Sequence, residues 1–347
     1  MSAHVPDTMR AVVLERPGTE GLEVRTVPVP EVGVDDVLVR IRACGIGRTV
    51  LNKVRGLTQD QLPRIPAHEA AGEIVAIGPG VRGLEVGQQV LVYYYVTCGR
   101  CRHCWVGRET LCDEVAGRYL RVGEDRDGAL AEYVRLGVRN VIPMPEGLDP
   151  VAATTAPDAI ATPLHIARRT ALASGETIAV IGAAGGVGVH MLQVARWMGA
   201  RAIAVDVPGK LDDLVRYGAT DLVDGTAPGW EKALRGRVDV AVDLVGTPDT
   251  LTSAMDLLAP GGRLALLTVD RDVTFPVAPF RMVGGELTIV GSKYANHTEV
   301  LRAAELLLDG TIEAVVSNVV DLEGAPDVLR SIERNDFFAR GAMALDF

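Results

Sequence analysis

Residues 177–291 alternate between short apolar segments and stretches of helical character, and this alternation constrains the fold more than any other feature. Short apolar segments bounded by turn residues are typical of buried strands. Strands that alternate with helices form a parallel sheet with helices on both faces. The pattern therefore predicts an α/β fold with a doubly wound parallel sheet, whose strands cover 177–181, 202–206, 238–246, 263–269 and 287–291.

A glycine-rich turn follows the first of these strands and leads into an amphipathic helical stretch. The glycines let the backbone approach a pyrophosphate closely, and the helix N-terminus stabilises its negative charge. The alternative is that the glycines serve only helix–strand packing, but their place between a strand and a helix favours a nucleotide site. The predicted contacts are Gly182, Gly185, Gly186, Val187 and Gly188.

Asp206 ends the next predicted strand, eighteen positions after Gly188. A carboxylate there can accept hydrogen bonds from the adenosine ribose hydroxyls and would repel a 2′-phosphate. We therefore expect NAD(H) to be favoured over NADP(H), although nearby Lys210 weakens the preference. We also expect the cofactor to contact residues where later strands end, namely Val245, Gly291 and Ser292.

The chain from residue 10 to about 150 has a different texture, with short β-like runs broken by Gly and Pro. Such spacing predicts a compact, mostly antiparallel β domain. The tail after about residue 292 begins with a helical stretch and returns to β-like sequence.

Four of the five cysteines lie within fifteen residues in a C-x2-C-x2-C-x7-C arrangement. Four thiolates at such spacing suit a tetrahedral zinc with no open position, which is a structural site. Two disulfides are the alternative, but spacings of two residues would strain them. We predict one structural zinc on Cys98, Cys101, Cys104 and Cys112.

The composition is that of a globular protein, with a net charge of −10 and a pI near 5.2. No basic stripe is present to neutralise phosphates, so nucleic acid is not an expected partner. No apolar run reaches the length of a membrane span, and the first ten residues lack an apolar signal segment. With reduced cysteines, these features predict a cytoplasmic location.

A further motif, Ala67-His68-Glu69 followed by Gly72, Gly78 and Val81, accompanies the cysteine loop and the glycine-rich turn. Together these resemble the medium-chain dehydrogenase/reductase superfamily, zinc-type alcohol dehydrogenase branch. The resemblance implies an NAD(P)-dependent oxidoreductase that acts on a small-molecule substrate as a homodimer or homotetramer. It also implies a GroES-like catalytic domain formed by residues 1–157 and 292–347, with a zinc lobe at about 97–113, and a Rossmann domain at 158–291.

In that family a catalytic zinc is held by a Cys, by the His of this motif and by a Cys or Asp before the Rossmann domain. His68 and Asp158 match two of these ligands, but Gly47 stands where the Cys belongs. Val50 stands where an acidic residue orients the zinc-binding His. Loss of one ligand, and of the residue that orients the His ligand, makes tight zinc binding unfavourable. We therefore expect the catalytic zinc to be absent.

Several alternatives remain open. Cys44 could substitute after a loop rearrangement, or it could be a buried, inert thiol. A residual metal site could form from His68, Glu69 and Asp158, with weaker affinity because it lacks a thiolate. Asp158 could instead be the N-cap of a helix that begins at Ala159.

Neighbouring positions keep the family pattern. Arg48 matches a residue that contacts the cofactor pyrophosphate, and Thr49 matches the hydroxyl that relays a proton from the substrate. Asn52 replaces the distal His of that relay, which shortens it. The alternatives are a solvated charge at Arg48 and a β-branched residue on a buried turn at Thr49. The run from Tyr93 to Tyr95 could supply a phenolic proton donor.

Without zinc, alcohol–ketone chemistry loses the Lewis acid that stabilises charge on one oxygen. Hydride addition to a C=C bond conjugated with a carbonyl is less demanding, because its charge spreads into an enolate that hydrogen bonds can stabilise. We therefore expect a zinc-independent reductase of an activated C=C or carbonyl substrate. The alternatives are a zinc-dependent alcohol dehydrogenase with an atypical metal site and a non-redox nucleotide-sensing or interaction protein.

Overall fold

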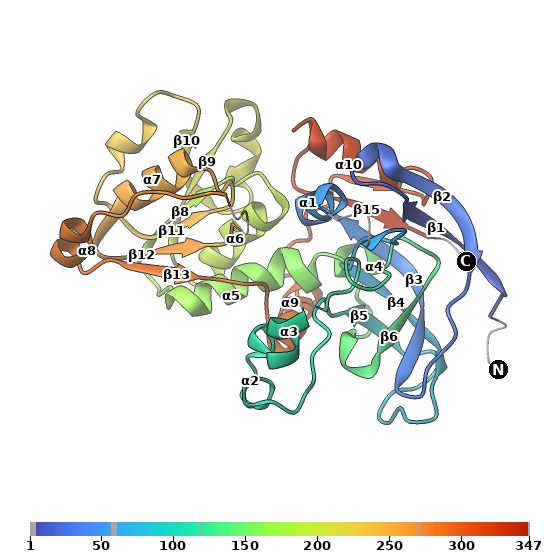
Figure 1. Ribbon diagram of the computed structural model, residues 1–347. Coiled ribbons are helices and arrows are strands. Elements are labelled where there is room, and N and C mark those ends of the chain that lie inside the picture. The colour runs from blue at the N-terminus through green and yellow to red at the C-terminus, as the bar shows by residue number, and fades with distance from the viewer. Residues whose placement is uncertain (1–4, 57–60, 119, 269, 271, 346–347) are drawn as a thin grey trace. The chain divides into compact units, whose positions relative to one another are not determined.

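The computed structural model describes residues 5–345 apart from 57–60, 119, 269 and 271 (Figure 1). The chain forms two compact units. Unit 1 comprises Met1–Asp158, Ala295–Gly310 and Ala314–Phe347, and unit 2 comprises Ala159–Tyr294 and Thr311–Glu313. Asp158 therefore groups with unit 1, whereas residues 292–294 and 311–313 group with unit 2, unlike the division expected from the sequence.

Unit 2 contains a six-stranded sheet in which every neighbouring pair of strands is parallel. This confirms the predicted doubly wound fold. From one edge to the other, the strands are β10 (Ala219–Asp224), β9 (Arg201–Asp206), β8 (Thr177–Ile181), β11 (Val238–Asp243), β12 (Leu258–Leu266) and β13 (Thr288–Gly291). The sequence did not predict β10, because this edge strand is mostly exposed or half-buried and lacks an apolar run.

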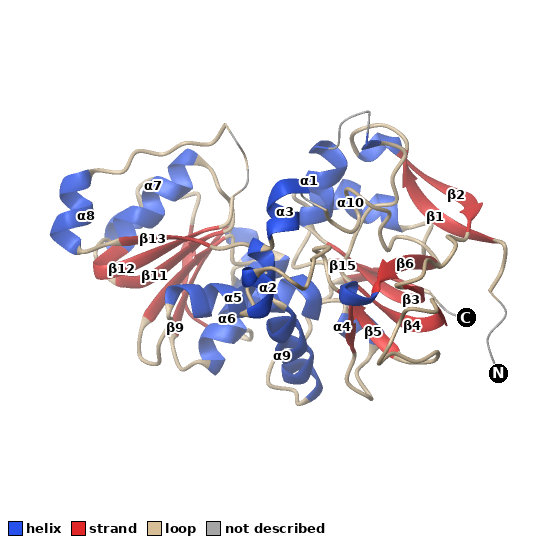
Figure 2. Ribbon diagram, turned by 60° about the horizontal axis from the view of Figure 1, so that its bottom comes forward, coloured by secondary structure: helices blue, strands red, loops and turns tan. Residues whose placement is uncertain are grey.

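Helices cover both faces of this sheet. Figure 2 shows α5 (Ala161–Thr170) and α6 (Gly186–Trp197) on one side, and α7 (Pro248–Leu257) and α8 (Pro279–Gly285) on the other. The start of α7 is fixed by a capping box in which the side chains of Thr247 and Thr250 bind each other's backbone N–H groups.

Unit 1 is built around a seven-stranded sheet that is antiparallel except for its outermost pair, β14 and β15. The strand order is β14 (Asn318–Val320), β15 (Gly341–Ala344), β3 (Asp36–Ile46), β4 (Ala70–Ile77), β5 (Gln89–Val92) and β7 (Val141–Pro143), and β6 (Tyr133–Gly137) also pairs with β3. Because β15 comes from the C-terminal part of the chain, unit 1 is assembled from both ends of the sequence. A separate antiparallel pair is formed by β1 (Thr8–Leu14) and β2 (Leu22–Pro28).

The register of β3 against β4 is supported by packing and by charge. Arg40 lies opposite Glu73, which accepts hydrogen bonds from Arg40 (3.0 Å) and from Arg42 (3.1 Å). The other faces of these strands contribute to one apolar core. The helices of unit 1 are α1 (Arg48–Gly56), α2 (Arg102–Trp105), α3 (Asp113–Arg118), α4 (Pro150–Ala153), α9 (His297–Leu308) and α10 (Ala325–Glu333). Within the described part of the chain, no helix combines the length and apolarity needed to cross a bilayer.

Candidate active site and cofactor site

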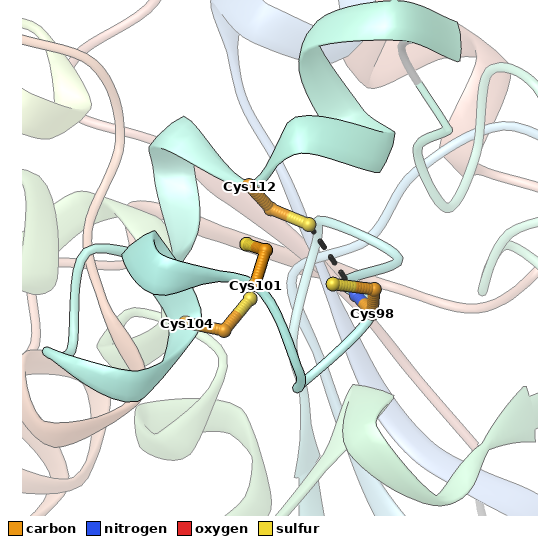
Figure 3. Close-up of side chains that lie close together, drawn as sticks. All are labelled: Cys98, Cys101, Cys104 and Cys112. Atoms are coloured by element: carbon orange, nitrogen blue, oxygen red, sulfur yellow. Dashed lines mark hydrogen bonds between the residues drawn. The ribbon is translucent and has the colours of Figure 1, made fainter.

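The four cysteines of the lobe turn their sulfur atoms toward one another (Figure 3). All four lie within 4.8 Å of one another, and the backbone N–H of Cys98 donates to the sulfur of Cys112 at 3.3 Å. A tetrahedral zinc with Zn–S bonds of about 2.3 Å would set its sulfurs about 3.8 Å apart. The donor set and its spacing therefore fit a structural zinc.

The lobe is anchored by the N-terminus of α9, a contact that the sequence did not reveal. The side chain of Asn296 donates to the carbonyl oxygen of Gly107 (3.0 Å). The imidazole of His297 lies 3.0 Å from a carboxylate oxygen of Glu109 and 2.9 Å from the carbonyl oxygen of Arg139. Two segments of unit 1 that are distant in sequence therefore hold the lobe in place.

His68, Glu69 and Asp158 form a second cluster of possible metal ligands. The three side chains are buried, and each offers one ligand atom within 4.8 Å of the others. His68 Nε2 lies 3.6 Å from Asp158 Oδ2. Ala67 directs this turn with a φ of 74°, a left-handed conformation that is strained for a residue with a Cβ. A glycine would adopt this conformation without that strain.

Arg340 belongs to this cluster and was missed by sequence reasoning. Its Nη2 donates to Glu69 Oε2, and both side chains are almost fully buried. Burial raises the pKa of Glu69, although the Arg340 cation opposes the rise. No local motif marks Arg340, because it reaches the site through the pairing of β15 with β3, in which Gly341 lies opposite Ile46.

Gly47 faces the same ion pair. A Cβ built at this position would lie 3.4 Å from Arg340 Nη2 and 3.6 Å from Glu69 Oε1. Position 47 therefore points toward the cluster but contributes no donor atom. Cys44 does not replace it, since its thiol lies in the apolar core of unit 1, where burial raises its pKa.

Asp158 lies in a π-helical turn, Ala156–Ile160, that precedes α5. Helix α5 begins at Ala161, and its N-cap residue is Ile160, which makes no side-chain cap. The alternative interpretation of Asp158 as the N-cap of a helix starting at Ala159 is therefore wrong. Single π turns occur often at functional sites, and this one points a carboxylate toward His68.

Helix α1 carries the other candidate residues of unit 1. Thr49 is half-buried, Asn52 is exposed, and Arg48 Nη2 donates to the side-chain oxygen of Asn335 at 2.6 Å. Lys53 and Arg55, on the same helix, both form ion pairs. Lys53 Nζ lies 3.3 Å from Glu124, and Arg55 lies 2.6 Å from Glu333.

The three consecutive tyrosines are all buried. The Tyr93 hydroxyl donates to the carbonyl oxygen of Ala295 at 2.9 Å, and the Tyr94 hydroxyl donates to Glu124. The Tyr94 ring packs on the imidazole of His68, with centroids 4.1 Å apart. Burial, and then the Glu124 charge, raise the pKa of Tyr94 well above its usual value.

The glycine-rich turn of unit 2 has the geometry of a nucleotide site. Gly188 lies in the first turn of α6, where a Cβ would come within 2.3 Å of the carbonyl oxygen of Gly182, so only glycine fits. Gly182 itself has a φ of 84°. Asp206 follows at the end of β9 and accepts a hydrogen bond from the backbone N–H of Ala184 in the turn (2.8 Å). The carboxylate is thus held beside the turn.

The remaining predicted cofactor contacts of unit 2 differ in exposure. Val245 is 52% exposed and Gly291 ends β13. Ser292 is buried, and its hydroxyl oxygen has no hydrogen-bond partner among the described residues, as expected of a group that awaits a ligand. Lys210 lies in a 3₁₀ turn, Pro208–Lys210, just after β9. The residues present therefore fit a dinucleotide.

Comparison with known proteins extends over both units. Residues 33–146 match the family described as alcohol dehydrogenase GroES-like domain, and residues 186–309 match the family described as zinc-binding dehydrogenase. An acryloyl-coenzyme A reductase from Sulfurisphaera tokodaii is 29% identical over 328 residues, or 94% of this chain and 96% of the relative. An alcohol dehydrogenase from Geobacillus stearothermophilus is 30% identical over 345 residues, or 97% and 100%. The crystal structure of AibC matches at 28% identity with a TM-score of 0.89 and covers 100% of both chains.

Proposed function

Because the chain belongs to the alcohol dehydrogenase branch of the medium-chain dehydrogenase/reductase superfamily and is an oxidoreductase, we propose that it reduces an activated C=C bond without a catalytic zinc. The preferred substrate class is an α,β-unsaturated carbonyl compound, in particular an acyl thioester. Bound reduced nicotinamide supplies the hydride.

The observation that carries this proposal is the donor set around His68. Gly47 faces the cluster at the position where the family has a thiolate ligand, but it offers no donor atom. Glu69 is already paired with Arg340. His68 and Asp158 remain, and two such donors without a thiolate make a weak zinc site. Similarity to an acryloyl-coenzyme A reductase supports an α,β-unsaturated thioester as the substrate.

The residues of unit 1 would then bind and orient the substrate. Thr49 offers a hydroxyl donor at the start of α1. The hydroxyl groups of Tyr93 and Tyr94 already donate to Ala295 and Glu124, so they do not supply the phenolic donor considered from the sequence. Burial of His68 and Asp158 keeps water from this part of the site, which strengthens every hydrogen bond made to a developing negative charge.

The proposal is tested by assaying the purified chain with NADH and acryloyl-coenzyme A, before and after dialysis against a chelator. We expect NADH consumption that survives the removal of loosely bound metal. Oxidation of simple alcohols by NAD should be slower by orders of magnitude, since each step of about 1.4 kcal/mol in lost charge stabilisation lowers the rate tenfold. Alcohol oxidation that exceeds thioester reduction and disappears on chelation would contradict the proposal.

A second function is favoured by one observation, the convergence of His68, Glu69 and Asp158. If these residues hold a labile zinc, the protein is an alcohol dehydrogenase with an atypical metal site. Similarity to an alcohol dehydrogenase from Geobacillus stearothermophilus agrees with this alternative. The chelation experiment separates the two functions, because only the second depends on a removable metal.

We further propose NAD(H) as the cofactor, on the basis of the Asp206 carboxylate at the end of β9. Replacing Asp206 with serine removes the charge that repels a 2′-phosphate. We expect the ratio of kcat/KM for NADPH to that for NADH to rise by about tenfold or more, equivalent to about 1.4 kcal/mol. Asp221→Ser, a change at an exposed carboxylate in β10, is the matched control and should leave the ratio unchanged. A wild-type preference for NADPH would contradict the assignment.

A further inference from the structure

A buried carboxylate that the proposed reaction does not yet use lies beside the His68 cluster. Glu124 is 2% exposed. Its Oε1 accepts a hydrogen bond from Tyr94, and its Oε2 pairs with Lys53 at 3.3 Å and with Arg121 at 2.6 Å. Because Tyr94 packs on His68, a single aromatic ring separates this ionic group from the cluster.

Helix α1 places Lys53 beside Glu124. Lys53 comes four residues after Thr49, so the two side chains leave the same face of the helix. Its side chain is 24% exposed, whereas that of Glu124 is 3% exposed, so part of Lys53 is accessible to a small molecule. An ammonium has three N–H donors, and the ion pair with Glu124 engages one of them.

The neighbouring polar side chains are held by partners within the protein. Arg121 uses Nε for Asp125 and Nη1 for Glu124, and the Tyr94 hydroxyl donates to Glu124. Lys53 makes one ion pair in this group, so its ammonium retains N–H donors for a substrate. Glu124 holds the ammonium in a fixed place, which is what stabilisation of a developing charge requires.

We propose that Lys53 is a catalytic residue that donates a hydrogen bond to the substrate carbonyl oxygen as it becomes an enolate. This rests on the proposed reduction of an activated C=C bond. As hydride from reduced nicotinamide adds to the β-carbon, the C=C π electrons form a new C=C bond to the carbonyl carbon, and the carbonyl π electrons move to oxygen. A proton from water then adds to the α-carbon, and Lys53 keeps its own proton. Glu124 acts as a positioning residue, and a fixed ammonium charge supplies the stabilisation that a metal would give.

The test compares Lys53→Met with Lys53→Arg and with Arg55→Met. Arg55 lies on the same helix and pairs with Glu333, so its replacement removes a cation from α1 at a different place. With acryloyl-coenzyme A and NADH, we expect Lys53→Met to lower kcat about 10²–10³-fold, the usual effect of removing one donor to a developing oxyanion. KM and the NADH dissociation constant should change little, Lys53→Arg should recover part of kcat, and Arg55→Met should behave like the wild type.

The double variant Lys53→Met/Glu124→Gln is the control for misfolding of the single variant. It removes both charges of the ion pair, and the new amide at position 124 can still accept the hydrogen bond from the Tyr94 hydroxyl. It should fold and show the same loss of kcat. Suppose that the wild type reduces the thioester and that Lys53→Met has the same kcat as Arg55→Met. Lys53 is then not catalytic, but the proposed function stands. If Lys53→Met does not fold, the double variant is compared with Arg55→Met instead. If the wild type reduces no activated C=C bond, the proposed function itself fails.

Discussion

Replacing Cys112 with serine is expected to release the tightly bound zinc and to unfold the lobe between residues 98 and 112. The segment has few apolar residues and no core of its own, so its order depends on the metal. Zinc binding to four thiolates is worth on the order of 10 kcal/mol at neutral pH. Cys112 is also fully buried, and its sulfur accepts the backbone N–H of Cys98, so serine would lose a ligand at the centre of the lobe.

We expect the free energy of unfolding of unit 1 to fall by several kcal/mol, on the order of 5. Zinc content by elemental analysis should fall from about one per chain toward zero, and limited proteolysis should cut within the lobe. Cys44→Ala is the matched control, since it removes a cysteine from the apolar core and should leave the zinc in place. A Cys112→Ser protein with full zinc content and an intact lobe would contradict the assignment.

Replacing Gly47 with cysteine is expected to create a second zinc site. A Cβ at this position would lie 3.4 Å from Arg340 Nη2 and 3.6 Å from Glu69 Oε1, which are ordinary van der Waals distances, so a Cβ fits here without a backbone shift. Its thiolate would join His68 and Asp158, which already lie 3.6 Å apart, and would complete a set of three protein ligands. Zinc per chain should rise from one to two.

Alcohol oxidation by this variant should rise by about tenfold or more, because a Lewis acid now stabilises charge on the substrate oxygen. Gly47→Ser is the matched control, with a side chain of similar size but no thiolate, and it should gain neither zinc nor alcohol oxidation. If Gly47→Cys binds no additional zinc, position 47 is not where the metal ligand was lost.

The fold could be predicted from the sequence where strands are buried. The expected strand at 177–181 coincides with β8, because its short apolar run is buried and bounded by turn residues. The edge strand β10 was not predicted, because most of its side chains are exposed or half-buried and its sequence resembles that of a loop. Short polar strands are recognised only when a neighbouring strand supplies their hydrogen bonds.

The candidate site could be predicted only where short motifs carry it. Local sequence pointed to His68 and Asp158, and the structure brings them together. Arg340 and Glu124 were missed, because strand pairing and turn geometry place them beside residues far away in the chain. The π-helical turn at Asp158 was missed for a related reason, since an acidic residue before a helix has the sequence pattern of an N-cap.

The central claim, that the site around His68 works without zinc, is tested most directly by a crystal structure of the active wild-type protein with anomalous diffraction recorded at the zinc absorption edge. We predict one anomalous peak per chain, among the sulfurs of Cys98, Cys101, Cys104 and Cys112. A second peak of full occupancy between His68 and Asp158 would contradict the account and identify a metal-dependent alcohol dehydrogenase.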